Sequence, residues 1–204
     1  MRVEVYIPDT LSEITLGQYQ KYLKIQSENE DENFLAIKMI EIFCGLRGDT
    51  IMAMKAHSIK DITLILTEMF NEKPALVKNF KMNGKTYGFI PKLDDMTFGE
   101  YIDLDTYIGD TANLHRAMAV LYRPVKQTYK EKYLIEDYKG GESDIMKDMP
   151  MDAVLSSILF FYHLGMELSQ TMMNCLQGEE MDLVQQQLLE ENGDGINHFS
   201  ASLK

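Results

Sequence analysis

The stretches that decide the fold are "ITLGQY" at residues 14–19 and "MTFGEY" at residues 96–101. Each follows an Ile-Pro pair, in "IPDTLSE" for the first stretch and in "IPKLDD" for the second. A phosphate-binding loop needs several glycines and usually a lysine before its helix. Each stretch has one glycine and no adjacent lysine, so neither one indicates a nucleotide site.

Helix capping accounts for both stretches. If Thr15 is an N-cap, Gln18 stands at the third helical position, and Thr97 has the same relation to Glu100. In such a capping box the threonine hydroxyl accepts a backbone N–H, and the side chain three residues later accepts the N–H of the threonine. We therefore expect one helix to begin after Thr15 and another after Thr97.

The rest of the chain alternates predicted helices with short strands. Ser58 is predicted to cap a third helix, with Asp61 three residues later. "VEVYI" at residues 3–7 alternates apolar and polar residues, which predicts a short strand. "FKMNGKTYGFI" at residues 80–90 places Asn-Gly between two strand-like runs, which is typical of a hairpin.

The predicted elements occur in the same order in both halves: strand, Ile-Pro turn, capped helix, apolar helix, loop and apolar helix. The two stretches lie 82 residues apart, and the offset grows through a second predicted hairpin, an insertion near residues 124–140. We interpret this order as an internal duplication, with chance similarity of short helical patterns as the alternative.

The expected fold is therefore mainly α with small β-hairpins, of class α+β, in an internally duplicated domain with pseudo-twofold packing. This α-rich domain covers residues 1–178, and its related halves are about 1–78 and 79–178. Residues 179–204 are predicted to form an acidic C-terminal helix and tail.

Composition narrows the functional classes. The 204 residues are 45% hydrophobic and 25% charged, which is ordinary for a folded soluble protein. The net charge of −12 repels nucleic acid backbones, so we expect no direct nucleic-acid partner. The longest apolar stretch, at residues 153–166, is too short to span a bilayer, and the first residues lack an apolar signal core. We therefore expect neither a membrane partner nor export.

Residues that commonly carry catalysis form no recognised pattern. Cys44 and Cys175 stand in apolar stretches without a CxxC arrangement, which predicts buried reduced thiols and a reducing compartment. His163 and Glu167 are four residues apart and would supply only half of a metal site. The frequent acidic pairs are typical of solvated surfaces. We expect no catalytic residue, no cofactor and no metal, and a protein that is not an enzyme.

Methionine is unusually frequent, with fifteen residues. Met146, Met149 and Met151 cluster where a loop meets a helix. Methionine fills cores and also forms adaptable protein-binding surfaces. Both roles remain open, so these three are candidate interaction residues.

Four strings in the second half carry a resemblance: "FIPKLDDMTFGEYIDLD", "AVLYRPV", "YLIEDYKG" and "MPMDAVLSSILFFYHLG". Together they resemble small α-rich proteins in the morphogenesis modules of tailed bacteriophages, some of which are described as tail-assembly-chaperone-like. The resemblance covers about residues 88–168 and, more weakly through the repeat, residues 7–70. It implies other phage structural proteins as partners and a location in the host bacterial cytoplasm during assembly, with the virion as a second location that stays open. Homo-oligomerisation is also compatible with it.

Three functions follow as hypotheses. The first is a non-enzymatic virion structural or adaptor protein that acts through protein–protein contacts. The second is a tail-assembly chaperone that is absent from the mature particle. The third is an acidic enzyme or regulator.

Overall fold

The computed structural model describes residues 5–130, 132–140 and 143–177. Within these ranges the chain is a mixed α+β structure with seven α-helices and one four-stranded antiparallel sheet. The prediction of a helix-rich α+β chain with β-hairpins is thereby confirmed. The predicted helix and tail at residues 179–204 lie outside the described residues.

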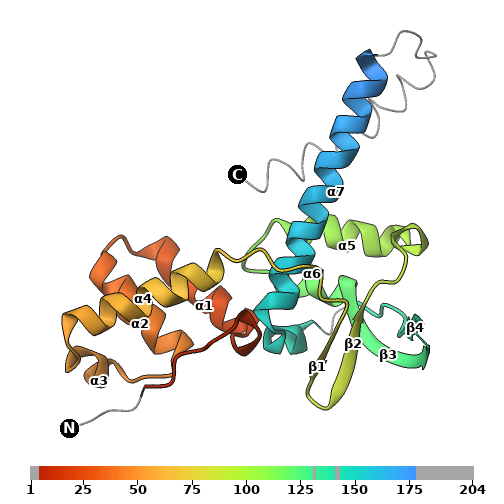
Figure 1. Cartoon of the computed structure of the whole chain (residues 1–204). Helices are drawn as coiled ribbons and strands as arrows, with labels where there is room; N and C mark the ends of the chain where they lie inside the picture. Colours follow the sequence, from red (N-terminus) through yellow and green to blue (C-terminus); the bar gives the residue numbers. More distant parts are fainter. Residues whose placement is uncertain (1–4, 131, 141–142, 178–204) are drawn as a thin grey trace.

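The regular elements of the first half are all helices within its described residues, and this half forms one end of the molecule (Figure 1). An aromatic cluster joins its helices: the ring of Phe43 lies 5.1 Å from that of Phe70 and 5.5 Å from that of Tyr22. The elements of this half are η1 (Leu11–Glu13), α1 (Leu16–Glu28), α2 (Glu32–Phe43), α3 (Gly48–Met52) and α4 (Ala56–Phe70).

The second half adds the sheet, which lies at the other end of the molecule with α5 and α6 (Figure 1). The strands follow the order β1-β2-β3-β4, and every neighbouring pair is antiparallel. Its elements are β1 (Asn79–Met82), β2 (Lys85–Phe89), η2 (Leu93–Asp95), α5 (Phe98–Ile108), α6 (Leu114–Leu121), β3 (Tyr122–Tyr129), β4 (Lys132–Ile135) and η3 (Asp144–Asp148).

Both predicted hairpins are present. Asn83 and Gly84 have φ values of 50° and 74° between β1 and β2, as a type I′ turn requires. The second hairpin, β3–β4, begins at Tyr122, slightly before the predicted insertion. The strand predicted at residues 3–7 is not found, because residues 5–7 belong to no strand and residues 3–4 are outside the described part.

One glycine in β2 is required by packing. A Cβ at Gly88 would lie 2.5 Å from Cε2 of Tyr133, so the tyrosine ring rests directly on the glycine. The hydroxyl of Tyr133 donates to the carbonyl oxygen of Phe89 at 2.7 Å. This contact fastens β4 over β2, across the strand that separates them.

The helix α7 (Met151–Gln177) has a buried part and a projecting part. Its first turns pack in the core, where Met151, Ala153 and Val154 are fully buried. The remainder leads away from the body of the molecule (Figure 1). The stretch Met151–Thr171 is long and apolar enough to cross a membrane, which is weak support for a span because core helices pass the same test.

The start of α4 corrects one prediction. The helix begins at Ala56 after Lys55, so Ser58 lies in the first turn and is not its N-cap. The backbone N–H of Ser58 already donates to the carbonyl of Lys55 at 3.0 Å, whereas an N-cap residue keeps an extended backbone outside the helix. Asp61 therefore lies in the second turn and forms no capping box.

Candidate functional site

The first capping box is complete and faces the protein interior. The backbone N–H of Gln18 donates to Oγ1 of Thr15 at 3.3 Å, and the N–H of Thr15 donates to Oε1 of Gln18 at 2.9 Å. The amide nitrogen of Gln18 also donates to the carbonyl of Ile42 at 2.9 Å, which ties α1 to the end of α2. Ile14 and Leu16, on either side of the threonine, are fully buried.

A segment distant in sequence bonds to the backbone on either side of Thr15. The N–H of Leu16 donates to the carbonyl of Met149 at 2.8 Å, and the N–H of Met151 donates to the carbonyl of Ile14 at 2.9 Å. Residues 149–151 thus run antiparallel to residues 14–16, with Pro150 opposite the threonine. We call this arrangement the Thr15 site.

The three candidate interaction methionines belong to this internal contact. Met146, Met149 and Met151 are at most 1% exposed. Their side chains are held in the core by η3 and the start of α7, so they form no surface for an outside partner. The core-packing role is the one that the structure supports.

The second capping box has the same internal geometry but a charged support. The N–H of Thr97 donates to Oε2 of Glu100 at 2.6 Å, and the N–H of Glu100 donates to Oγ1 of Thr97 at 3.3 Å. Arg123 of β3 donates from Nη1 to Oε1 of Glu100 at 2.6 Å. Both side chains of this pair are buried, with exposures of 11% and 7%.

A groove of about 1470 Å³ opens beside the second box. We call it the Thr97 groove. It runs between η2 with the start of α5 on one side and β4 with the following loop on the other. Its apolar lining comes from six elements or connections and includes Phe89, Ile90, Leu93, Ile102, Leu134 and Phe160. The lining is therefore mainly apolar, and it also includes acidic and basic side chains.

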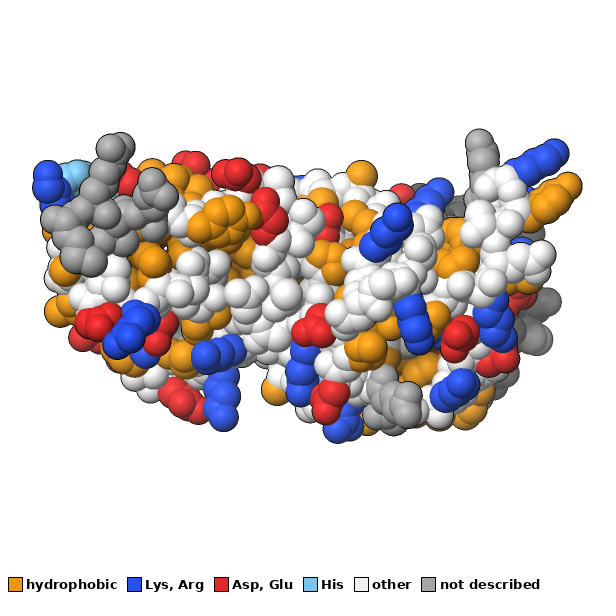
Figure 2. Space-filling model, turned by 90° about the horizontal axis from the view of Figure 1, so that it is seen from below, with side chains coloured by type: hydrophobic (Ala, Val, Ile, Leu, Met, Phe, Trp, Pro, Cys, Tyr) orange, Lys and Arg blue, Asp and Glu red, His pale blue; other side chains and the backbone are white. Residues whose placement is uncertain are grey.

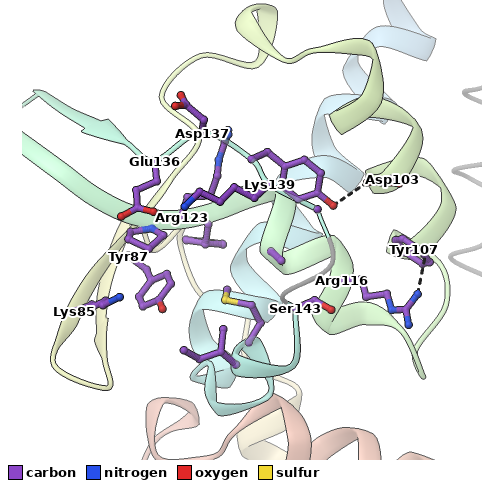
Figure 3. A pocket seen from close by; sticks show the side chains of 17 residues that line it. Lys85, Tyr87, Asp103, Tyr107, Arg116, Arg123, Glu136, Asp137, Lys139 and Ser143 are labelled. Carbon is purple, nitrogen blue, oxygen red and sulfur yellow. Dashed lines mark hydrogen bonds between the residues drawn. The ribbon is translucent and has the colours of Figure 1, made fainter.

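A second cavity of about 550 Å³ adjoins the groove and is lined by polar and charged side chains (Figure 3). The hydroxyl of Tyr138 donates to Oδ2 of Asp103 at 2.8 Å. Arg116 donates to the hydroxyl of Tyr107 at 3.3 Å and lies over its ring. Figure 3 shows Asp103, Tyr107 and Arg116 on the α5–α6 side of the cavity, with Lys85 on the opposite side.

The chemistry of this cavity is that of binding by hydrogen bonds. Burial and the neighbouring carboxylate of Asp103 raise the pKa of Tyr138 far above its usual value, so its hydroxyl stays protonated and acts as a donor. The Nε atom of Arg123 is buried and has no hydrogen-bond partner among the described residues. The cavity therefore offers both hydrogen-bond donors and carboxylates.

The fold does not place the histidines of the described residues together in one site. His115 is buried, and its Nδ1 lies 3.2 Å from the amide nitrogen of Gln20, at the junction of the two halves. Burial, and secondarily the charge of Lys147, lowers the pKa of His115. His163 is exposed on α7. Across the described residues, no group of three or more His, Cys, Asp or Glu side chains is placed to hold a metal ion.

The cysteines are only partly described. Cys44 is half-buried as a free thiol, and burial raises its pKa to about 11. A thiol with so high a pKa is a poor nucleophile at neutral pH. The side chain of Cys175 is outside the described part of the structure.

The surface opposite the projecting end of α7 has no single character. Figure 2 shows this face with lysines, arginines, acids and hydrophobic side chains intermixed over both halves. Exposed large apolar side chains occur, among other places, at the start of α5 and on the outer part of α7.

Comparison of the chain with known protein families, with characterised proteins and with solved structures finds no match in any of the three.

Sequence reasoning found the capping boxes but missed what surrounds them. Arg123 and Tyr138 come from segments distant in sequence from Glu100 and Asp103, and no local spacing joins them. The one available signal was Glu100, which stands where the first box has Gln18. A carboxylate that becomes buried needs a cation beside it.

Proposed function

We propose that this chain is a non-enzymatic structural or adaptor protein of a tailed bacteriophage particle, and that it acts through contacts with other phage proteins. The support from the sequence is the resemblance over about residues 88–168. The support from the structure is the exposure of large apolar side chains on α7.

The apolar side of α7 is the feature that carries the proposal. Six residues are spaced alternately four and three apart along one side of the helix: Leu155, Leu159, Tyr162, Met166, Ser169 and Met173. Such spacing is typical of a helix that packs lengthwise against another helix. Tyr162, Met166 and Met173 are nevertheless 42%, 54% and 52% exposed.

Charge agrees with a protein partner on this helix. Residues 159–177 contain one acid, Glu167, and no lysine or arginine, in a chain whose net charge is −12. Most of the stability of a helix in a protein comes from packing of its apolar face and not from helix propensity. A helix this apolar and this weakly charged is stabilised by burying one side against a partner, and a phage assembly supplies such partners.

We further propose that the two halves arose by duplication. The support is local: a three-residue 3-10 helix, an extended residue, a threonine N-cap and a complete capping box occur in that order in both halves. In this proposal the sheet was added to the second half after the duplication. Pseudo-twofold packing of the halves is part of the same proposal.

Mass spectrometry of purified particles tests the proposed function. We expect this protein in stoichiometric amount relative to a particle protein of known copy number. Absence from finished particles, with presence in assembly intermediates, would contradict the structural role and favour the tail-assembly chaperone, for which the open Thr97 groove provides a place to hold a partner.

Variants of α7 sharpen the same experiment. Met166→Asp with Met173→Asp places charge on the apolar side of the helix, and we expect loss of the protein from particles. Thr171→Asp is the matched control, because residue 171 lies on the other side of the helix. Equal incorporation of both variants would show that this side of α7 makes no contact.

A further inference from the structure

The Thr97 groove is the open counterpart of the Thr15 site. In the Thr15 site, an extended segment of the same chain lies along the residues that precede α1 and bonds to their backbone. Met96 and Phe98 occupy the positions of Ile14 and Leu16 in the second box. The C=O of Met96 and the N–H of Phe98 have no backbone partner among the described residues.

The backbone conformations of the two boxes agree. Thr15 has φ −93° and ψ 153°, and Thr97 has φ −73° and ψ 157°. The residues before them, Ile14 and Met96, are also extended. The same pair of hydrogen-bonding groups is therefore presented in the same direction relative to each helix.

The glycine in each box points to the same conclusion. A Cβ at Gly17 would lie 3.1 Å from the carbonyl oxygen and 3.2 Å from Cβ of Lys147, so glycine permits close approach of the seated segment. A Cβ at Gly99 would meet nothing within 4 Å. Glycine inside a helix is unfavourable relative to alanine. At Gly17 close packing offsets this cost, whereas Gly99 lacks such a contact in the described structure.

Exposed apolar side chains surround the open box. Phe98 is 78% exposed, and Tyr101 and Ile102 are 49% and 46% exposed. Leu16, at the position of Phe98, is fully buried. Phe98 stands between Thr97 and Gly99, which line the groove, and an exposed phenylalanine in that position is a favourable contact for an incoming chain.

The segment seated in the Thr15 site shows which chemistry fits. Its sequence at residues 147–151 is Lys-Asp-Met-Pro-Met. The two hydrogen bonds involve the residues on either side of Pro150, so the missing N–H of proline costs no bond. Met149 and Met151 are fully buried on either side of it.

Charge defines the partner further. Residues 93–108, which form the α5 side of the groove, contain five acids and no lysine or arginine. Glu100 is paired with Arg123, and Asp95 lies 3.8 Å from Lys92. Of these acids, Asp94 and Asp103 line the groove and have no basic partner within ion-pair distance in the described structure. A basic residue of the partner on this side would complement them. In the segment seated in the Thr15 site, the backbone oxygen and Cβ of Lys147 lie against Gly17, and its ammonium pairs with Asp144.

We propose that the Thr97 groove binds an extended segment of a partner protein in which proline stands between two apolar residues and a lysine or arginine precedes them. The segment donates to the C=O of Met96 and accepts from the N–H of Phe98. This inference rests on the proposed function, because it assigns one protein contact of the assembly to a named surface.

A peptide with the sequence of residues 143–153, SDIMKDMPMDA, is the probe. The experiment measures the fluorescence anisotropy of the labelled peptide against the full-length protein. We expect saturable binding. A peptide methylated on the nitrogen of its second proline-flanking methionine lacks the required donor, and we expect it to bind about tenfold more weakly.

Two variants at one position isolate the backbone bond. Phe98→Pro removes the N–H at the first helical position, where proline is well tolerated, and the extended Thr97 before it is compatible with proline. Phe98→Ala keeps that N–H and is the matched control. We expect about tenfold weaker binding for Phe98→Pro than for Phe98→Ala. Gly99→Val, whose side chain has free space in the unbound protein, should block the peptide as well.

Three results would overturn the inference. One is the absence of saturable binding to the wild-type protein. Another is binding that neither Phe98→Pro nor Gly99→Val weakens, since the peptide then binds elsewhere. The third is a dimer, detected by light scattering, that Phe98→Pro abolishes although the peptide still binds. Residues 147–151 would then be exchanged between two copies of this chain, and the groove would not bind a segment of a partner protein. Particle composition is measured separately, so failure here is distinct from failure of the proposed function.

Discussion

The two capping boxes have the same internal bonds and opposite surroundings. The Thr15 box is covered by residues 147–151 and contributes fully buried side chains to the core. The Thr97 box borders a groove and presents an exposed phenylalanine, while an ion pair with Arg123 supports it from behind. A short sequence motif therefore specifies how a helix begins, and distant residues decide whether that beginning is a core element or a surface.

The largest difference is expected for the apolar residue that follows each threonine. Leu16→Ala removes a fully buried side chain and should lower the free energy of unfolding by about 2–5 kcal/mol. Phe98→Ala changes a residue that is 78% exposed and should lower it by less than about 0.5 kcal/mol. Urea unfolding of both variants measures the difference. Similar losses would mean that the second box is as enclosed as the first.

The next difference concerns the supporting side chain. Glu100→Gln leaves Arg123 buried without its carboxylate, and we expect a loss of about 3 kcal/mol in unfolding free energy. Adding Arg123→Met to Glu100→Gln removes the unpaired charge and should recover part of that loss. A double variant less stable than Glu100→Gln alone would contradict the assigned pairing.

Glycine distinguishes the boxes next. Gly17→Val forces a side chain against Lys147 and should cost about 1–3 kcal/mol of unfolding free energy. Gly99→Val meets open space and should be neutral or slightly stabilising, because valine is a better helix former than glycine. Thermal unfolding followed by circular dichroism compares the two variants, and an equal loss would show that the second box is also covered.

The threonines should behave alike. Thr15→Ala and Thr97→Ala each remove a cap that accepts one backbone N–H, and each should cost about 1 kcal/mol of unfolding free energy. Replacement by serine keeps the acceptor and is the control. If only one of the two alanine variants is destabilised, the surroundings and not the cap set the energy.

The smallest effect is expected from pH. Gln20 of α1 reaches the carbonyls of Thr111 and Ala112 and the ring of His115, whereas its counterpart Ile102 is exposed. The pKa of His115 is lowered in the folded state, so its contribution to stability is complete above about pH 6.5 and decreases as the pH falls through the folded value. His115→Gln should reduce the slope of the unfolding free energy against pH between pH 7 and pH 5. An unchanged slope would assign that dependence to other groups.

Local features of this fold could be predicted from the sequence. Thr15 with Gln18 and Thr97 with Glu100 fixed two helix starts, and Asn83-Gly84 fixed a turn, because the groups that bond are neighbours along the chain. The start of α4 was misplaced because Ser58 satisfies the pattern of a cap while helix formation already begins at Ala56. The free energy gained from a capping side chain is too small to decide by itself where a helix begins.

The candidate site could not be predicted in the same way. The bridge between Thr15 and Pro150 joins residues far apart in sequence, as do the pairs Glu100 with Arg123 and Asp103 with Tyr138. Periodicity predicts which side of an element is apolar, but it does not say which element covers that side. For the same reason Met149 was open to two interpretations until its burial was known.

The seating of residues 149–151 on α1 also sets an order of events during synthesis. Leu16 is translated 135 residues before Met151. At roughly 5–20 residues per second, that interval is on the order of 10 s, during which the first helical half has no cover for Ile14 and Leu16. The nascent chain is therefore open to aggregation or to chaperone binding until its own later segment arrives.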